Sequence, residues 1–304
     1  MKQFALKFFC LLALTGCGTA WSVTCSITAT SIPLSTTYKS GTATQLTGTI
    51  SGSCTPLNAT EASSRPWIYI GLNQGEPPAG RAMTRQNGSE TLTYQIYHAN
   101  YGSGTWTEGA GVASTNKSAG GVVYQMTNTN AAQTFSYAYY FNISTPQASA
   151  PAGIYDDLAI VATIRLSNNA GLATSTILSS ASFGVSASIV SSCYFSSAPT
   201  PLSINYTSFT ATPASGTSTF QLSCTYGSPY TLSLDAVPPP SVTSLTTAPL
   251  LGLPIQLSLS AGSGTGSAAP QSFSVTGTIA AGQSGDCALG LCSASQPHTV
   301  FVGF

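Results

Sequence analysis

The stretch Thr299-Val300-Phe301-Val302-Gly303-Phe304 stands at the C-terminal end of the sequence and has the pattern of a β-strand. Val300, Val302 and Phe304 occupy every second position, so an extended backbone places all three side chains on one face. A strand this apolar at the edge of a β-sandwich leaves a row of unpaired N–H and C=O groups, with which another chain can pair. We therefore expect the C-terminal part of the protein to be one strand short and to accept that strand from a partner.

The composition excludes several classes of protein. Charged residues make up 5% of the 304 residues and the formal net charge is zero, so the protein has no field that would attract nucleic acid or an anionic membrane surface. Hydrophobic residues make up 42% and are spread along the chain, which argues against disorder. Short apolar runs separated by Ser, Thr, Gly and Asn favour an all-β fold, and the length leaves room for two domains.

The first twenty residues have the pattern of a signal peptide. Lys2 and Lys7 precede an apolar core at residues 8–14, and Gly18-Thr19-Ala20 offers a small-residue cleavage site before Trp21. The apolar run is too short to span a bilayer. We therefore expect export and cleavage after Ala20.

A second interpretation of the same segment stays open. Leu14-Thr15-Gly16-Cys17 resembles a lipobox, in which Cys17 would become the lipidated first residue of the mature protein. Cleavage after Ala20 instead leaves an even number of cysteines. Mass spectrometry of the mature N-terminus would distinguish a chain that starts at Trp21 from a diacylated Cys17.

The six cysteines that remain after this cleavage fall into three sequential pairs. They are Cys25 with Cys54, Cys193 with Cys224, and Cys287 with Cys292. In an exported protein such pairs indicate disulfides formed in an oxidising compartment. A metal site is the alternative for these cysteines, but neither His98 nor His298 lies at ligand spacing to a CxxC pair, and we expect no metal.

The first two cysteine pairs also mark an internal repeat. Cys25–Cys54 encloses Ile32-Pro33-Leu34-Ser35 and then Tyr38, while Cys193–Cys224 encloses Thr200-Pro201-Leu202-Ser203 and then Tyr206. Two similar units of this kind predict two similar domains.

Alternating apolar residues predict a series of short strands that form two β-sandwiches. The predicted strands cover residues 23–29, 46–54, 67–70, 92–96, 122–126, 135–143, 158–166, 183–189, 220–222, 230–234, 255–259, 273–279 and 299–304. We expect a turn at Gly153-Ile154-Tyr155-Asp156 and a flexible loop at residues 262–266. The strand that ends at Ile189 runs into Cys193, so we divide the mature chain into domains 21–190 and 191–304, after the signal peptide 1–20.

These features together resemble the Spore Coat Protein U domain family, which includes subunits of archaic (Csu-type) chaperone–usher pili. The resemblance covers essentially the whole mature chain as a tandem of two domains. Each motif alone is a weak indication of the family, and the order of the motifs is a more specific one. The residues that carry it are the three cysteine pairs, Arg81-Ala82-Met83, residues 92–97, Trp106, residues 152–157, residues 277–283 and the closing strand.

The resemblance implies immunoglobulin-like pilin domains that bind a periplasmic chaperone and polymerise at an outer-membrane usher by donor-strand complementation, without a cofactor. The adjacent pilin subunit would supply an extended segment to the edge formed by Val300, Val302 and Phe304. After cleavage, Trp21 to Thr24 would precede Cys25, a reach of roughly 14 Å that is too short to complement a neighbour. We therefore expect a two-domain subunit at the pilus tip on the cell surface, which mediates adhesion to abiotic or host surfaces and biofilm formation.

The same sequence bears on other functional classes. The sequence has no Gly-x-Ser-x-Gly or His-Glu-x-x-His motif, and Asp156 and Asp157 would face opposite sides of a strand, so we expect no catalytic residues. His98 is a lone histidine in a tyrosine-rich region. A shaft pilin, a structural coat protein and a secreted carbohydrate-binding β-sandwich remain alternatives. In the last of these, an exposed Trp106 would stack on sugar rings.

The candidate adhesive residues lie in predicted loops. The strand at residues 183–189 must run toward the second domain, so the connection before it, residues 168–174, starts at the opposite pole. Leu172 stands at the centre of this connection and has no place in the strand pattern on either side. Leu57 and Val112 are its proposed companions in an apolar patch, although a single exposed leucine is also normal on a protein surface.

Overall fold

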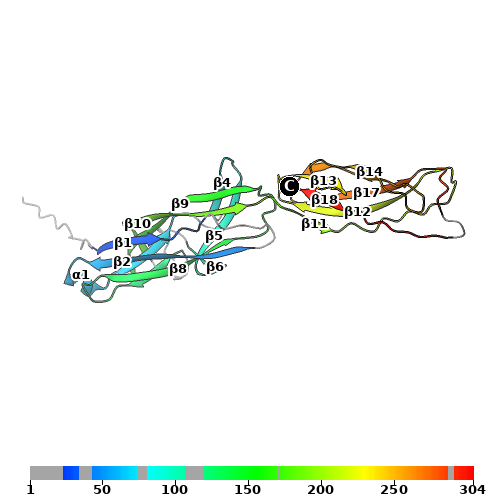
Figure 1. Cartoon of the computed structure of the whole chain (residues 1–304). Coiled ribbons are helices and arrows are strands. Elements are labelled where there is room, and N and C mark those ends of the chain that lie inside the picture. The colour runs from blue at the N-terminus through cyan, green and yellow to red at the C-terminus, as the bar shows by residue number, and fades with distance from the viewer. Residues whose placement is uncertain (1–22, 34–42, 74–80, 107–119, 170–171, 287–290) are drawn as a thin grey trace, which may run out of the picture.

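The computed structural model describes residues 23–33, 43–73, 81–106, 120–169, 172–286 and 291–304. These residues form antiparallel β-strands with one short helix, so the all-β prediction is confirmed. None of the helical residues described belongs to a helix long and apolar enough to cross a membrane. Figure 1 shows the strands in two groups that lie end to end.

The first half of the molecule, residues 23–189, folds into two layers that β5 joins. One layer contains β1 (Val23–Ala29), β2 (Thr44–Pro56), β8 (Gln133–Ile143), β5 (Thr91–Asn100) and β6 (Ser103–Thr105). The other contains β7 (Val122–Gln125), β3 (Trp67–Leu72), β9 (Gly153–Asn169) and β10 (Leu172–Ile189), with β4 (Arg81–Arg85) between β9 and β5. Tyr94 of β5 pairs with β4 and the next residue, Gln95, pairs with β8, so β5 passes from one layer to the other.

A short helix, α1 (Ala59–Ser64), follows β2 and was not predicted. Asn58 caps it, because its side-chain Oδ1 accepts a hydrogen bond from the Glu61 N–H at 3.0 Å. The Glu61 carboxylate in turn accepts from the Leu57 N–H at 2.8 Å. These two bonds fix the chain where it enters the helix.

The core of the first half forms where the alternating residues of both layers meet. The largest fully buried side chains there include Trp106, Tyr139, Tyr155, Phe141, Ile50, Ile68, Ile70, Leu72, Met83 and Leu92. The last strand, β10, contributes Phe183, Val185, Ala187 and Ile189, all buried. The alternation that predicted these strands is therefore the alternation that fills the core.

The second half, residues 193–304, has its own hydrophobic core, which shares no residue with the first. One layer has the order β11 (Cys193–Ser197), β12 (Ala214–Cys224), β17 (Gln271–Ile279), β15 (Gln256–Leu259) and β14 (Ser244–Thr246). The other has the order β16 (Ser263–Thr265), β13 (Pro229–Leu234) and β18 (Val300–Gly303). The division into domains 21–190 and 191–304 and the immunoglobulin-like topology stay predictions.

Two of the predicted disulfides are confirmed. Cys25–Cys54 joins β1 to β2 and Cys193–Cys224 joins β11 to β12, with sequence separations of 29 and 31 and the same Cα–Cα distance of 4.1 Å. Cys292 is disulfide-bonded, while Cys287, its predicted partner, lies outside the described residues.

Three predicted loops are wrong, because strands occupy them. Gly153 to Asp156 belong to β9 and pair with residues 186–189 of β10. Ser263 to Thr265 form β16. The predicted connection at residues 168–174 lies mostly within β9 and β10, which leaves residues 170–171 between them. These strands contain many Ser, Thr and Gly residues and so lack a pattern of alternating apolar residues. Their backbones nevertheless pair with neighbouring strands.

The two halves repeat each other in strand order. By their pairing, β1, β2, β8, β5 and β4 correspond to β11, β12, β17, β15 and β14, and β7, β3 and β9 correspond to β16, β13 and β18. Hydrogen bonds repeat as well: the Thr30 N–H donates to the Thr49 carbonyl at 3.0 Å, and the Thr200 N–H donates to the Thr219 carbonyl at 3.1 Å. This correspondence allows the halves to be compared strand by strand.

Candidate functional site: the edge of β18

The two corresponding strands β9 and β18 differ in their neighbours. β9 pairs with β3 on one edge and with β10 on the other. β18 pairs with β13, through Leu232 opposite Val302 and Leu234 opposite Val300, and with no other strand of the described chain. The described residues of the second half therefore contain no counterpart of β10.

The burial of side chains follows this difference. Ile160, Ala162 and Ile164 of β9, which pairs with β10 along that edge, are buried in the first core. Val300 and Val302 of β18 pack against the second core but are half-buried. Phe304, which we predicted to share their face, follows the end of β18 and is 62% exposed.

In the first half, the other side of β10 contacts the chain that follows β1. In the first half, the Ile32 N–H donates to the Gly184 carbonyl at 3.0 Å, and the Ser186 N–H donates to the Ile32 carbonyl at 3.2 Å. The matching backbone hydrogen bonds of Thr30 and Thr200 place Leu202 where the first half has Ile32, and Leu202 is half-buried where Ile32 is buried. We call the place between β18 and residues 200–204 the open strand position.

A polar cluster holds the beginning of β18 against the end of β13. The Asp235 carboxylate accepts from the Thr299 N–H at 2.7 Å and lies 2.6 Å from His298 Nδ1, while the Asp235 N–H donates to the Thr299 carbonyl at 2.9 Å. Burial raises the pKa of Asp235, but the hydrogen bonds from His298 and Thr299 lower it more, so the pKa lies below its ordinary value. This cluster was not predicted, because no sequence motif joins Asp235 to His298.

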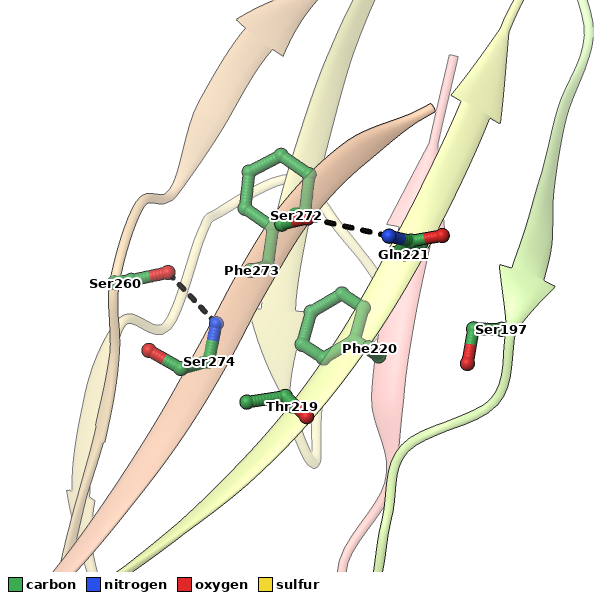
Figure 2. A pocket seen from close by; sticks show the side chains of 8 residues that line it. All are labelled: Ser197, Thr219, Phe220, Gln221, Ser260, Ser272, Phe273 and Ser274. Carbon is green, nitrogen blue, oxygen red and sulfur yellow. Dashed lines mark hydrogen bonds between the residues drawn. The ribbon is translucent and has the colours of Figure 1, made fainter. Parts of the chain in front are cut away.

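Four aromatic rings pack against one another in the second half of the molecule. Phe220 stacks on Phe273 with ring centroids 5.5 Å apart, Phe195 meets Phe220 at 5.6 Å, and Tyr230 meets Phe273 at 6.1 Å. Figure 2 shows Phe220 and Phe273 on neighbouring strands in a shallow hollow that Ser, Thr and Gln side chains complete. None of its eight lining residues is ionisable, so the hollow offers no acid, base or charged ligand.

The structure removes Trp106 as a sugar-stacking residue. The side chain is fully buried, and its Nε1–H donates to the Ile70 carbonyl at 3.0 Å inside the first half. The ring of His98 packs edge-on to it with centroids 6.1 Å apart. The prediction of an exposed aromatic was wrong because the tryptophan satisfies its N–H within the core.

The three candidate adhesive residues have different outcomes. Leu57 is 65% exposed beside α1. Leu172 begins β10 and pairs with Asn169, but its side chain lies outside the described part of the structure, as does the whole of Val112. Trp67 pairs with Ser167, so the chain that leaves α1 lies at the same pole as the end of β9. Whether these residues form one patch stays a prediction.

The carboxylates considered for catalysis make structural hydrogen bonds. Asp156 accepts from Gln86 Nε2 at 2.6 Å, and Asp157 accepts from the Tyr94 hydroxyl at 2.7 Å. Burial, followed by that bond to a carboxylate, raises the pKa of Tyr94 far above its ordinary range. Within the described residues, no group of three or more His, Cys, Asp or Glu side chains is placed to hold a metal ion. The expectation that the protein is not an enzyme stays a prediction.

Comparisons with known proteins complete the description of the site. The sequence model of the Spore Coat Protein U domain matches residues 13–162 and 179–246, which is more than half of the chain. A search of curated proteins gave no match. One similar solved structure is the CsuC–CsuE chaperone–tip adhesion subunit pre-assembly complex from archaic chaperone–usher Csu pili of Acinetobacter baumannii. It has 12% sequence identity and a TM-score of 0.42, and the match covers 92% of this chain and 100% of that chain. That TM-score is too low to carry an argument about function.

Proposed function

Since this chain belongs to the Spore Coat Protein U domain family, we propose that it is a pilus subunit that accepts a donor strand at the edge of β18. In this proposal a periplasmic chaperone first fills the open strand position. An adjacent pilin subunit then replaces the chaperone at an outer-membrane usher. The subunit reaches the cell surface as the tip of the pilus.

One observation carries this proposal: β18 has one paired edge where its counterpart β9 has two. An extended segment placed at the free edge would gain main-chain hydrogen bonds, as in other cases of β-augmentation. Its alternate side chains would cover Val300 and Val302 from the side that β10 covers in the first half. Full burial of one such aliphatic side chain contributes roughly 1.5–3 kcal/mol relative to exposure.

The difference between the halves supports a position at the tip. The first half already contains β10, which occupies the position that the second half leaves to a partner. A subunit with one complete half and one open half can end a polymer with the complete half outermost. The expected cleavage after Ala20 supports this placement, because it leaves no arm long enough to donate.

Adhesion is then assigned to the pole of the first half that carries α1. Leu57 is exposed there, and Leu172 and Val112 are the proposed companions that would give an apolar patch. A patch of this kind would attach to abiotic or host surfaces by apolar contact and so support biofilm formation. The burial of Trp106 leaves the carbohydrate-stacking alternative without its residue.

The donor-strand proposal is tested by placing a charge in the open strand position. We expect Val302→Asp to abolish capture by the chaperone or by a donor peptide, because the carboxylate would be buried without a partner at a cost of several kcal/mol. Tyr194→Asp is the matched control, since Tyr194 is exposed in the same half. Recovery of soluble complex from the periplasm measures capture.

The unmodified protein gives the decisive comparison in that experiment. Expressed alone it should aggregate or be degraded, and a chaperone or an appended donor segment should rescue it. Emission from the buried Trp106 reports whether the first half is folded, so loss of capture can be separated from general unfolding. A stable, soluble monomer without partner or donor would overturn the proposal.

Adhesion is tested with Leu57, Leu172 and Val112 all changed to Ser. We expect normal numbers of pili and reduced attachment to hydrophobic plastic. Binding to a glycan array serves as the test of the carbohydrate alternative. Normal attachment by normally piliated cells would show that the patch is assigned to the wrong residues.

A further inference from the structure

Two large apolar residues are exposed at the pole of the second half that lies away from the first half. Phe209 is 74% exposed and Leu251 is 37% exposed. The Phe209 N–H donates to the Gln283 carbonyl at 2.8 Å, and the Leu251 carbonyl accepts from the Asp286 N–H at 2.8 Å. Both loops therefore attach to the turn at residues 282–286. We call Phe209, Leu251 and this turn the far-pole patch.

The backbone at both residues has a conformation that bulky side chains disfavour. Phe209 has a φ of 58° and Leu251 a φ of 53°, in the left-handed region that bulky residues rarely adopt. Leu250 and Leu253 pair through two mutual backbone hydrogen bonds around Leu251 and Gly252, whose φ values are both positive. Such a two-residue turn strongly prefers Asn-Gly.

The first half has the residue that this turn prefers. Its β4–β5 connection corresponds to the β14–β15 connection and carries Asn87 at a φ of 60°. Asparagine tolerates this conformation because its short polar side chain bonds locally. The second half carries leucine at a similar place, so the geometry of the turn does not account for this apolar side chain.

The far-pole patch is held rigidly by its own hydrogen bonds. The Tyr206 hydroxyl donates to the Gln283 carbonyl at 3.0 Å and lies 2.7 Å from the Gln283 nitrogen, which donates to it. Ser208 Oγ donates to the Ser284 carbonyl at 2.6 Å, and the Gly282 N–H donates to the Thr210 carbonyl at 2.8 Å. Side chains presented from a fixed frame lose little further freedom when they bind.

The direction of the strands shows what arrives at this pole. In the first half, β10 is antiparallel to β9 and ends opposite the beginning of β9. Three residues then separate β10 from β11, the first strand of the next folded body. A donor that takes the same course along β18 ends at the beginning of β18, which pairs with Leu234 at the end of β13. The beginning of β18 lies at the pole away from the junction between the halves. The junction itself is marked by the hydrogen bond from the Thr225 N–H to the Ser192 carbonyl at 2.9 Å.

At the junction, the folded body that follows β10 contacts the first half. A β-carbon at Gly227 of the second half would lie 3.6 Å from Pro151 of the first half. Pro151 follows β8, and residues 282–286 follow β17, the strand that corresponds to β8. The far-pole patch thus occupies in the second half the place that touches the next body in the first half.

We infer that the far-pole patch docks the folded body of the neighbouring subunit, beside the point where its donor strand enters. This inference rests on the proposed function and adds to it a second contact with the same partner. Phe209 and Leu251 pack against that body, while the open strand position holds its arm.

The experiment separates the arm of the partner from its body. The probes are the shaft subunit that copurifies with this chain in isolated pili, and a synthetic peptide of that subunit's N-terminal arm. We compare the full chain with the double variant Phe209→Asn, Leu251→Asn, because asparagine suits both backbone positions and should leave the fold intact. Tyr226→Asn is the control, since Tyr226 is exposed near the junction at the opposite pole.

We expect the double variant to release the arm peptide at the rate of the wild type and to release the whole subunit at least roughly tenfold faster, which corresponds to about 1.4 kcal/mol. Equal release of the whole subunit from both proteins would overturn the docking inference and leave the proposed function standing. Failure of the wild type to capture either probe would instead overturn the proposed function. Thermal unfolding of the variant at or above the wild-type temperature confirms that the fold is intact.

Discussion

The layers β7-β3-β9-β10 and β16-β13-β18 have the same order, and they differ in one strand. Where the chain supplies that strand, Phe183, Val185 and Ala187 close a core whose side chains are buried. Where it does not, Val300 and Val302 remain half-buried although their pairing with β13 is intact. Among the described residues, the strand with two paired neighbours is thus the more deeply buried one, which is the basis of the proposal that the second half takes its second neighbour from a partner.

The largest expected effect comes from weakening the strand that the second half lacks. Phe183→Ala should destabilise the first half by about 3–5 kcal/mol, because Phe183 is buried in its core. Denaturant unfolding followed by tryptophan emission measures this loss, since both described tryptophans, Trp67 and Trp106, lie in the first half. Ser182→Ala, on the exposed face of the same strand, should change stability by less than about 0.5 kcal/mol. Similar losses for the two variants would mean that β10 does not close the core.

The disulfides give the next comparison. Removing Cys25–Cys54 or Cys193–Cys224 by paired Cys→Ala changes should each cost about 3 kcal/mol, because the loops have nearly equal separations of 29 and 31 residues. When no donor is bound, the first half should stay folded after losing this stability, whereas the second half should unfold. Proteolysis with mass spectrometry identifies which half is cut first. Preferential cutting of the first half would contradict the comparison.

Sequence patterns revealed the strands that alternate strictly and missed those that do not. Phe135, Tyr139, Phe141 and Ile143 predicted β8 because its inward side chains are apolar. Polar strands such as β16 and the beginning of β10 are held by backbone pairing, which leaves no mark on composition. The disulfides were predictable because cysteines in an exported protein have few other uses.

The candidate site was predictable in part, where its residues alternate along the strand. The alternation of Val300 and Val302 predicted the edge of β18, but Phe304 lies beyond the strand and is exposed. Trp106 was misassigned because its hydrogen bond to Ile70 joins segments far apart in sequence. Long-range partners of this kind decide burial, and a pattern of neighbours along the chain does not contain them.

A smaller effect should depend on the donor itself. With a donor segment bound, Val302→Ala should cost roughly 1.5 kcal/mol, the value expected for removing two buried methyl groups. Without a donor the cost should be smaller, because the side chain is half-buried. Chemical denaturation with and without an appended donor gives both values. Equal costs in the two states would mean that the donor does not cover Val302.

The smallest expected effects are opposite pH dependences of the two halves. The lowered pKa of Asp235 means that its contribution to the stability of the second half is present above its ordinary value near 3.8 and is lost as the pH falls through the lower folded value. Burial raises the pKa of Tyr139 to about 12, so the first half loses stability as the pH rises from 10 toward that value. Thermal unfolding of each half across pH measures both. Asp235→Asn should remove the acid dependence, and its persistence in that variant would point to another group.

Hydrogen exchange at the amides of β18 tests the central claim most directly. In freshly refolded protein without a partner, measured before it aggregates, we expect residues 300–303 to exchange much faster than the amides of β9 that lie between β3 and β10. Binding of the chaperone or of a donor peptide should slow exchange in β18 toward the rate of β9 and leave β9 unchanged. If β18 is as protected as β9 in the free protein, its second edge is not open, and the account of the second half as a strand acceptor is wrong.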